Sequence, residues 1–312
     1  MCSIADLPTD LATSILVHLS IQEVLPLRRL SRAFNALITS SHFATVHLIH
    51  LDIPSTGADT HHAGIDSIFL LVPESYADAF VRYKYSSRKS LLWGGLSLRG
   101  SIPKAIGNMT MLTYLMRVER SLACQPIAGS LPGEIGMLTK LKWLYLFNTN
   151  LSGPIPPEIC FLVELESLRL DHSGVSGPIP DNIGNLKNLK VLKLNGNALS
   201  GPLPGSITEL VHLETLLLDH NKLSGDIPLG LGKANQLKAL CLDHNQFTGS
   251  IPADFANLEK LNCLRLNDNR LSGTIPLEFN EFSPITEIVL NDNLLSGEIP
   301  IGLASGLQLT SL

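Results

Sequence analysis

Residues 213–228 read LETLLLDHNKLSGDIP, and a stretch of this form returns every 24 residues towards the C-terminus. Its closing Leu-Pro or Ile-Pro step begins at residues 131, 155, 179, 203, 227, 251, 275 and 299, each time two residues after a glycine. An earlier step, Ile102-Pro103, lies 29 residues before the step at 131, so we expect five extra residues between Arg117 and Gln125. A period of this length indicates a solenoid of stacked units.

Each unit begins with leucines that alternate with other side chains, as at Leu216 and Leu218. This alternation is typical of a short strand that buries one face, because successive side chains point to opposite sides. One such strand buries little apolar surface. The leucine core therefore becomes stable only when neighbouring units stack.

An asparagine follows the strand in five successive units, and we expect its amide to point inward and satisfy backbone groups of the turn. Earlier units have Thr149 and Ser173 in this column, and before them Gln125 and Leu96, so the first two units are degenerate, as terminal units usually are. The predicted asparagine ladder consists of Asn197, Asn221, Asn245, Asn269 and Asn293.

The repeated LxxLxLxxNxLSGxIP pattern closely resembles the plant-specific class of leucine-rich repeat. The resemblance covers residues 91–312, about nine units of 24 residues. It implies an α/β solenoid, an arc with a parallel β-sheet on its concave side and irregular or 3₁₀ segments on its convex side. Residues 69–90 contain a predicted helix that begins after Pro73 and would cap the array. Residues 307–312 align with the start of another strand, so we expect the array to be open at its C-terminus.

The first fifty residues are predicted to form three short helices, followed by a flexible linker at residues 51–68. The Leu7-Pro8 step, the spacing LxxxIL from Leu11 to Leu16 and the run LRRLSRAFNALI at 27–38 resemble an F-box, although Phe34 stands where that family usually has tryptophan. The resemblance implies docking on a Skp1-like adaptor of a cullin ubiquitin ligase. The alternative is that the helices only cap the first apolar edge of the solenoid. The implied adaptor contacts are Leu7, Pro8, Ile15, Leu16, Leu25 and Leu30.

The outward strand positions of the concave face form the candidate target-binding surface. One unit presents Trp143, Tyr145 and Phe147, and exposed aromatic side chains are enriched where interfaces gain their energy. The sequence does not separate this interpretation from one in which the rings pack on the irregular second unit. The residues that we expect at the target are Trp143, Tyr145, Phe147, Arg169, Asp171, Lys193, Asp219, Asp243 and Arg265.

Acids and imidazoles recur where the strands end, as at Asp219-His220 and Asp243-His244. Stacking would place the two histidines about 5 Å apart. Because a stacked column projects its side chains in parallel, we interpret this column as a solvated polar stripe and expect neither a metal nor a cofactor. Cys241 and Cys263 are expected on adjacent strands as a diagonal pair of reduced thiols.

The composition limits the partners. The chain is 45% hydrophobic and 16% charged with a formal net charge of −5, which favours neither a nucleic acid nor an anionic membrane as partner. No apolar run reaches the length of about 18 residues that a membrane span requires. The N-terminus lacks the positive charge of a signal peptide, and the five cysteines show no closely spaced pair. We therefore expect an intracellular protein, cytoplasmic or nuclear.

The sequence contains none of the common catalytic motifs, and we do not expect an enzyme. The F-box resemblance implies the substrate receptor of an SCF-type (Skp1-cullin-F-box) ubiquitin ligase, in which the concave face binds an unknown target protein. The main alternative is a receptor-like or scaffold protein that binds a peptide or protein ligand. A third is an inhibitor of a secreted polysaccharide-degrading enzyme, which would require export and disulfides in its cap.

Overall fold

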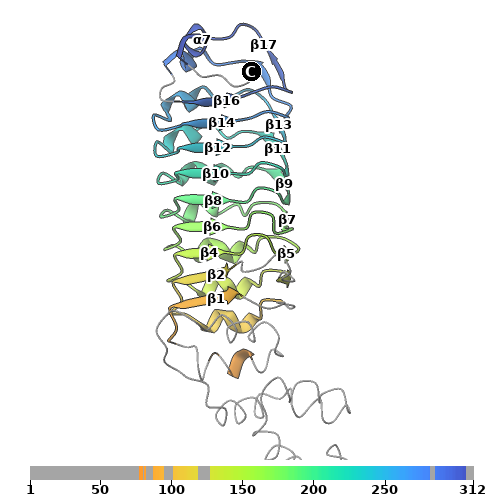
Figure 1. Cartoon of the computed structure of the whole chain (residues 1–312), viewed down its shortest axis with the longest axis vertical. Coiled ribbons are helices and arrows are strands. Elements are labelled where there is room, and N and C mark those ends of the chain that lie inside the picture. Colours follow the sequence, from red (N-terminus) through yellow and green to blue (C-terminus); the bar gives the residue numbers. More distant parts are fainter. Residues whose placement is uncertain are drawn as a thin grey trace, which may run out of the picture.

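The computed structural model of the chain describes residues 77–79, 81, 87–94, 101–118, 127–281 and 285–306. The predicted helical segment at 1–50 and the linker at 51–68 lie outside these ranges. Within the predicted cap, residues 77–79 are helical, and Ala77, Ala79 and Val81 are buried in the hydrophobic core. The units stack in sequence order along one long axis (Figure 1).

The strand of each unit pairs with that of the next in one parallel sheet of nine strands. The pairing is in register with the repeat, so that Thr215 lies between Val191 and Ala239. Inward positions such as Leu216 are fully buried, and outward positions such as Leu217 are partly exposed. The strands in spatial order are β1 (Ser90–Gly94), β2 (Tyr114–Val118), β4 (Trp143–Tyr145), β6 (Ser167–Arg169), β8 (Val191–Lys193), β10 (Thr215–Leu217), β12 (Ala239–Cys241), β14 (Cys263–Arg265) and β16 (Glu287–Val289).

Short 3₁₀ helices follow the Ile-Pro or Leu-Pro steps, as the repeat class implies. The proline precedes the first helical residue in several units, with φ near the fixed proline value, for example −63° at Pro204 and at Pro252. The predicted α/β solenoid with convex 3₁₀ segments is therefore confirmed for the described units. The helices are η3 (Lys104–Asn108), η4 (Gly133–Met137), η5 (Pro157–Phe161), η6 (Ile183–Asn185), η7 (Gly205–Glu209), η8 (Leu231–Lys233), η9 (Ala253–Asn257) and η10 (Leu277–Glu281), followed by one α-helix, α7 (Ile301–Gly306).

A second set of short parallel strands, which the sequence pattern did not predict, runs beside the main sheet (Figure 1). It is formed mainly by the Leu-Ser-Gly part of each unit, where the repeated glycine has a positive φ, as at Gly225 with 76°. The recurring Leu-Ser-Gly segment is the sequence feature from which these strands could have been predicted. The strands are β3 (Ala128–Gly129), β5 (Asn150–Leu151), β7 (Ser176–Gly177), β9 (Ala198–Pro202), β11 (Lys222–Asp226), β13 (Gln246–Thr248), β15 (Ser272–Thr274) and β17 (Leu294–Ser296).

The asparagine side chains of the ladder connect neighbouring units from inside the turn. The Asn245 amide donates to the carbonyls of Leu218, Leu242 and Asp243 at 3.0 to 3.1 Å, and its oxygen accepts from the Leu223 amide at 3.0 Å. Ser173 fills the same column with a hydroxyl that donates to the Leu146 carbonyl at 2.7 Å. Each of these side chains thus forms hydrogen bonds with buried backbone groups of two neighbouring units.

The described helices are all too short or too polar to cross a bilayer. The interval between β2 and β3, where the extra five residues are expected, has residues 119–126 outside the described ranges.

Candidate binding face of the repeat sheet

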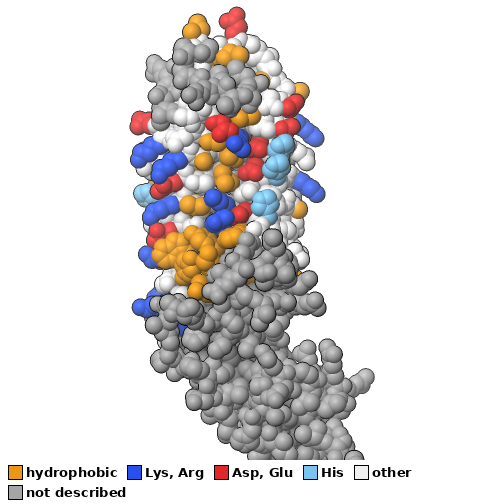
Figure 2. All heavy atoms as spheres, in the orientation of Figure 1, with side chains coloured by type: hydrophobic (Ala, Val, Ile, Leu, Met, Phe, Trp, Pro, Cys, Tyr) orange, Lys and Arg blue, Asp and Glu red, His pale blue; other side chains and the backbone are white. Residues whose placement is uncertain are grey.

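An aromatic cluster occupies the N-terminal part of the concave face. We define it as Tyr114 from β2, Trp143 and Tyr145 from β4, and Phe147 just after β4. Trp143, Tyr145 and Phe147 are half-buried, because the strand alternation turns them away from the leucine core. Figure 2 shows a compact hydrophobic patch near this end of the described units.

The rings of the aromatic cluster contact one another edge to face. The centroid of the Tyr114 ring lies 5.6 Å from that of Trp143 at an interplanar angle of 61°, and 6.1 Å from that of Tyr145 at 64°. Such geometry contributes roughly 0.5 to 1.5 kcal/mol per pair beyond area burial. Burial and the neighbouring Tyr145 raise the pKa of Tyr114, so its hydroxyl stays protonated at neutral pH.

Arg169 of β6 covers the cluster from the next unit. Its Cζ lies 4.3 Å from the ring centroid of Phe147 and 5.7 Å from that of Tyr145, within the range of a cation–π contact. Two hydrogen bonds to Asp171, from Nε at 3.2 Å and from Nη2 at 3.1 Å, fix the guanidinium plane. The positively charged guanidinium of Arg169 is therefore held at the edge of the aromatic cluster.

Sequence reasoning missed Tyr114, because the outward positions were followed only from the strand of Trp143 onwards. The signal was present in the register, since Tyr114 pairs directly with Trp143 and Met116 with Tyr145. The contacts of Tyr114 support part of each interpretation of the aromatic side chains, as a binding surface and as packing on the second unit. The rings do pack against the second unit, yet Trp143 and Tyr145 remain partly exposed.

The other residues expected at the target differ in exposure. Lys193 and Asp219 are half-buried and Arg265 is exposed, paired with Glu287 at 2.7 Å. Asp171 and Asp243 are only 8% and 7% exposed, which leaves them little surface for a partner.

A column of left-handed backbone precedes the asparagine column by one residue. We call it the αL column: Asn148, His172, Gly196, His220, His244, Asp268 and Asp292, with φ between 51° and 66°. Asn, Asp, His and Gly tolerate this conformation better than other residues, which explains their recurrence where the strands end. At Gly196 the adjacent unit adds a second constraint, since a Cβ there would lie 2.2 Å from Nδ1 of His172.

The histidines at 220 and 244 stack on each other, with ring centroids 4.1 Å apart and an interplanar angle of 14°. The expected separation of about 5 Å and the parallel projection of the rings agree with this geometry. Beside them, burial and the like charge of Asp243 raise the pKa of Asp219.

Cys241 and Cys263 are free thiols on β12 and β14. The register pairs Cys241 with Arg265 and Cys263 with Ala239, so the two cysteines are diagonal neighbours. Their mutual hydrogen bond, together with burial, raises the pKa of Cys241, and the same bond lowers the pKa of Cys263. Cys160 is buried elsewhere, and burial raises its pKa to about 11.

A charge ladder runs along the entry edge of the main strands, one residue before β4, β6, β8, β10 and β12. It alternates in sign, and Glu166 binds both Lys142 at 3.2 Å and Lys190 at 2.9 Å. These hydrogen bonds lower the pKa of Glu166. In Figure 2, side chains of both charge signs follow one another along one margin of the face, and histidines are seen on both margins. The ladder consists of Lys142, Glu166, Lys190, Glu214 and Lys238.

The expected adaptor contacts Leu7, Pro8, Ile15, Leu16, Leu25 and Leu30 all lie outside the described residues. The described face presents aromatic rings and a guanidinium held in place by a carboxylate.

Comparisons with known families place two kinds of module in the chain. The F-box domain family matches residues 4–45, the leucine-rich repeat region family matches residues 159–275, and a further leucine-rich repeat match covers residues 140–162. Both families are interaction modules. The comparison with curated proteins gives no match.

Several solved structures share the repeat fold. The plant peptide hormone receptor RGFR1 in complex with RGF2 is 31% identical with a TM-score of 0.62, over 77% of this chain and 41% of the receptor. The Arabidopsis receptor kinase HAESA in complex with the peptide hormone IDA and the co-receptor SERK1 is 32% identical with a TM-score of 0.65, over 76% of this chain and 38% of HAESA. A plant ice-binding protein is 26% identical with a TM-score of 0.57, over 73% of this chain and 70% of its own. The chain thus spans less than half the length of the two receptors.

Proposed function

The chain is a leucine-rich-repeat protein with an N-terminal F-box domain, and from this premise we propose its function. We propose that it is the substrate receptor of an SCF-type ubiquitin ligase. In this proposal the F-box docks a Skp1-like adaptor, and the concave face of the repeats binds the protein to be ubiquitinated. The observation that carries the proposal is the F-box match at residues 4–45 in the same chain as a repeat array that presents the aromatic cluster.

The adaptor half of the proposal rests on the F-box segment. The proposed contacts Leu7, Pro8, Leu16 and Leu30 all lie inside the matched range. Large apolar side chains at helical spacing, in a unit too small to bury them all, are what an adaptor interface needs. The proposal includes an intracellular location, because a ligase receptor acts where the cullin assembly is.

The target half rests on the aromatic cluster and Arg169. Interface hot spots are enriched in tryptophan, tyrosine and arginine that are rigidly held and partly exposed. Ring-to-ring contacts fix Trp143 and Tyr145, and the Asp171 carboxylate fixes Arg169, so little side-chain entropy remains to be lost on binding. We therefore place the centre of the target-binding surface at this cluster.

Co-purification of the full chain with a Skp1-like adaptor tests the proposal. Wild-type chain should retain the adaptor in a stoichiometric complex, and a variant with Leu16→Asp and Leu30→Asp should lose it, because a buried carboxylate at the interface is costly. A matched variant, Trp143→Ala, lies on the repeats and should retain the adaptor. Far-ultraviolet circular dichroism establishes that each variant is folded.

The opposite result has a defined meaning. If folded wild-type chain fails to retain the adaptor, the ligase proposal is wrong and the N-terminal helices act as a cap. If Trp143→Ala loses the adaptor while Leu16→Asp with Leu30→Asp keeps it, the assignment of the two surfaces is wrong.

A second candidate function is that of a peptide-binding receptor or scaffold. It is favoured by the likeness to RGFR1 and HAESA, both of which are described in complex with peptide hormones. In that case the wild-type chain should bind a peptide although it does not bind the adaptor, and Trp143→Ala should abolish peptide binding. The adaptor experiment therefore separates the two functions.

A further inference from the structure

We propose that His220, Asp243 and His244 form a binding site for a transition-metal dication of the Zn²⁺ type, at the exits of β10 and β12. This inference does not rest on the proposed ligase function, because it concerns groups that the repeat stacking itself brings together. One ligand atom from each of the three side chains lies within 4.8 Å of the others.

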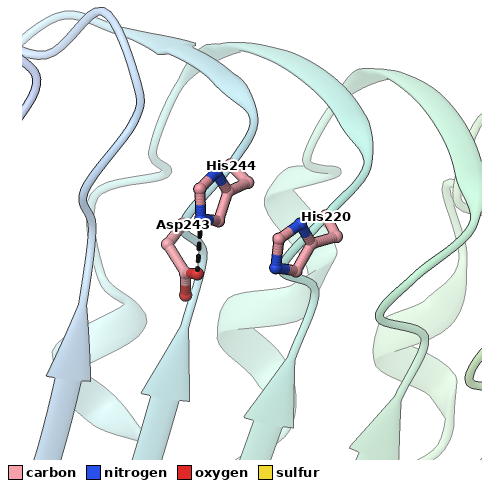
Figure 3. A group of neighbouring side chains, drawn as sticks. All are labelled: His220, Asp243 and His244. Carbon is pink, nitrogen blue, oxygen red and sulfur yellow. Dashed lines mark ion pairs between the residues drawn. The ribbon is translucent and has the colours of Figure 1, made fainter.

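Two adjacent members of the αL column supply the imidazoles. The left-handed backbone at His220 and His244, with φ of 53° and 51°, directs both side chains to the same flank of the sheet. Their rings stack with centroids 4.1 Å apart. In Figure 3 a ring nitrogen of His220 faces the Asp243 side chain, which lies beside both rings.

The Asp243 carboxylate has a buried oxygen that no donor satisfies among the described residues. The residue is 7% exposed, and its Oδ1 is buried without a hydrogen-bond partner among the described residues. Its Oδ2 lies 3.9 Å from Nε2 of His244, too far for a hydrogen bond. A buried carboxylate oxygen without a donor is unfavourable, and a bound cation would satisfy it.

Asp268 completes the arrangement around His244. Nδ1 of His244, the ring nitrogen that does not face Asp243, lies 3.5 Å from the Asp268 carboxylate. Metal-binding histidines usually direct their other nitrogen to a carboxylate or carbonyl, which fixes the ring orientation. This geometry directs Nε2 of His244 towards Asp243 and the proposed metal.

The donor set selects the class of cation. Two imidazole nitrogens and one carboxylate suit Zn²⁺ and related transition metals, whereas Ca²⁺ and Mg²⁺ prefer oxygen ligands alone. Tetrahedral zinc with bonds of about 2.0 Å needs ligand atoms about 3.3 Å apart. The ligand atoms must therefore move closer together on binding. Nε2 of His244 already faces Asp243, and the exposed side chain of His220 can turn towards it. The fourth position is left for water or for a group from a partner.

From the sequence we expect no metal, because stacked side chains project in parallel and do not converge. The ring planes are indeed nearly parallel, but the carboxylate comes from the residue before His244 and approaches from the side. Cys241 and Asp219 also lie within 4.8 Å of Asp243 in a second group, so a thiolate-bound metal is the alternative that the experiment must separate.

Isothermal titration of the untagged full chain with Zn²⁺ tests the proposal. We expect one equivalent to bind with a dissociation constant below about 10 µM. His220→Asn, His244→Asn and Asp243→Asn should each weaken binding at least about tenfold. His172→Asn is the matched control, because it lies in the same αL column two units away and should bind as wild type does.

Two further measurements keep the result interpretable. Bound Zn²⁺ should raise the thermal unfolding midpoint of the wild type and of His172→Asn, and this rise should disappear in folded His220→Asn and His244→Asn. Mg²⁺ and Ca²⁺ should produce no rise. Absence of saturable binding would overturn the proposal, and so would binding that survives His220→Asn and His244→Asn but is lost on Cys241→Ser.

Discussion

The asparagine column and the αL column occupy adjacent positions in the units from Gly196-Asn197 onwards, yet they have opposite chemistry. Asparagine side chains at 197, 221, 245, 269 and 293 lie inside the turn and form hydrogen bonds with the backbone of two units. The αL column is mostly exposed and varies among Asn, His, Gly and Asp. One column is uniform because the backbone uses its side chains, and the other varies because only its φ is constrained.

This difference separates the residues that hold the array together from those that remain available for a partner. An asparagine whose amide is already used by four backbone groups offers little to a ligand. At a histidine of the αL column only the backbone φ is constrained, so the ring nitrogens are not used by the backbone and can contact other groups. We therefore expect substitutions in the asparagine column to change stability more than substitutions at exposed side chains of the αL column.

The largest effect is expected at Asn245. Asn245→Ala should lower the free energy of unfolding by about 2 to 4 kcal/mol, because several buried backbone groups lose their partner at once. Asn245→Ser should recover part of the loss, since Ser173 already uses its hydroxyl in the same column. Urea unfolding followed by circular dichroism measures both. The exposed αL substitution His172→Asn should change stability by less than about 0.5 kcal/mol, and an equal loss there would contradict the contrast between the columns.

An intermediate loss of stability is expected at Gly196, where the positive φ and the close approach of His172 both restrict the side chain. Gly196→Ala should cost about 1 to 3 kcal/mol, because alanine is strained at a φ of 66° and its Cβ would clash with the His172 ring. Adding His172→Ala should restore the part that is due to the clash but not the part that is due to φ. A double-mutant cycle in urea separates the two, and strictly additive effects would show that the ring moves away without cost.

The smallest effect is expected in the charge ladder, whose side chains pair with each other at the surface. Lys190 and Lys142 lower the pKa of Glu166, so its contribution to stability is present above the ordinary glutamate pKa and is lost as the pH falls towards the lowered value. Glu166→Gln should therefore be less stable than wild type at pH 7 by no more than about 1 kcal/mol. The difference between the two unfolding curves should shrink in acid and in high salt. A difference that grows in acid would show that the sign of the pKa shift is wrong.

The repeat could be predicted in detail because its period carries redundant information. The inward leucines, the Ile-Pro steps followed by 3₁₀ helices and the strand positions all follow from one 24-residue pattern. The second set of strands was missed, because a Leu-Ser-Gly segment of two to five residues is too short to show an alternating pattern. Tyr114 was missed because the outward positions were followed only from Trp143 onwards, where the 24-residue period is regular, and Tyr114 lies before the irregular interval.

By itself, the sequence determined the period, the solenoid class, the outward strand positions and the F-box match, since each depends on residue types at fixed spacing. Only the tertiary structure decided which of the outward residues act together. Stacking set Arg169 on Phe147, left an Asp243 oxygen without a hydrogen-bond partner among the described residues and brought it next to two histidines from adjacent units. The physical reason is that a repeat fixes the backbone unit by unit, whereas contacts between side chains 24 residues apart depend on rotamers, burial and the ring or charge that the next unit happens to present.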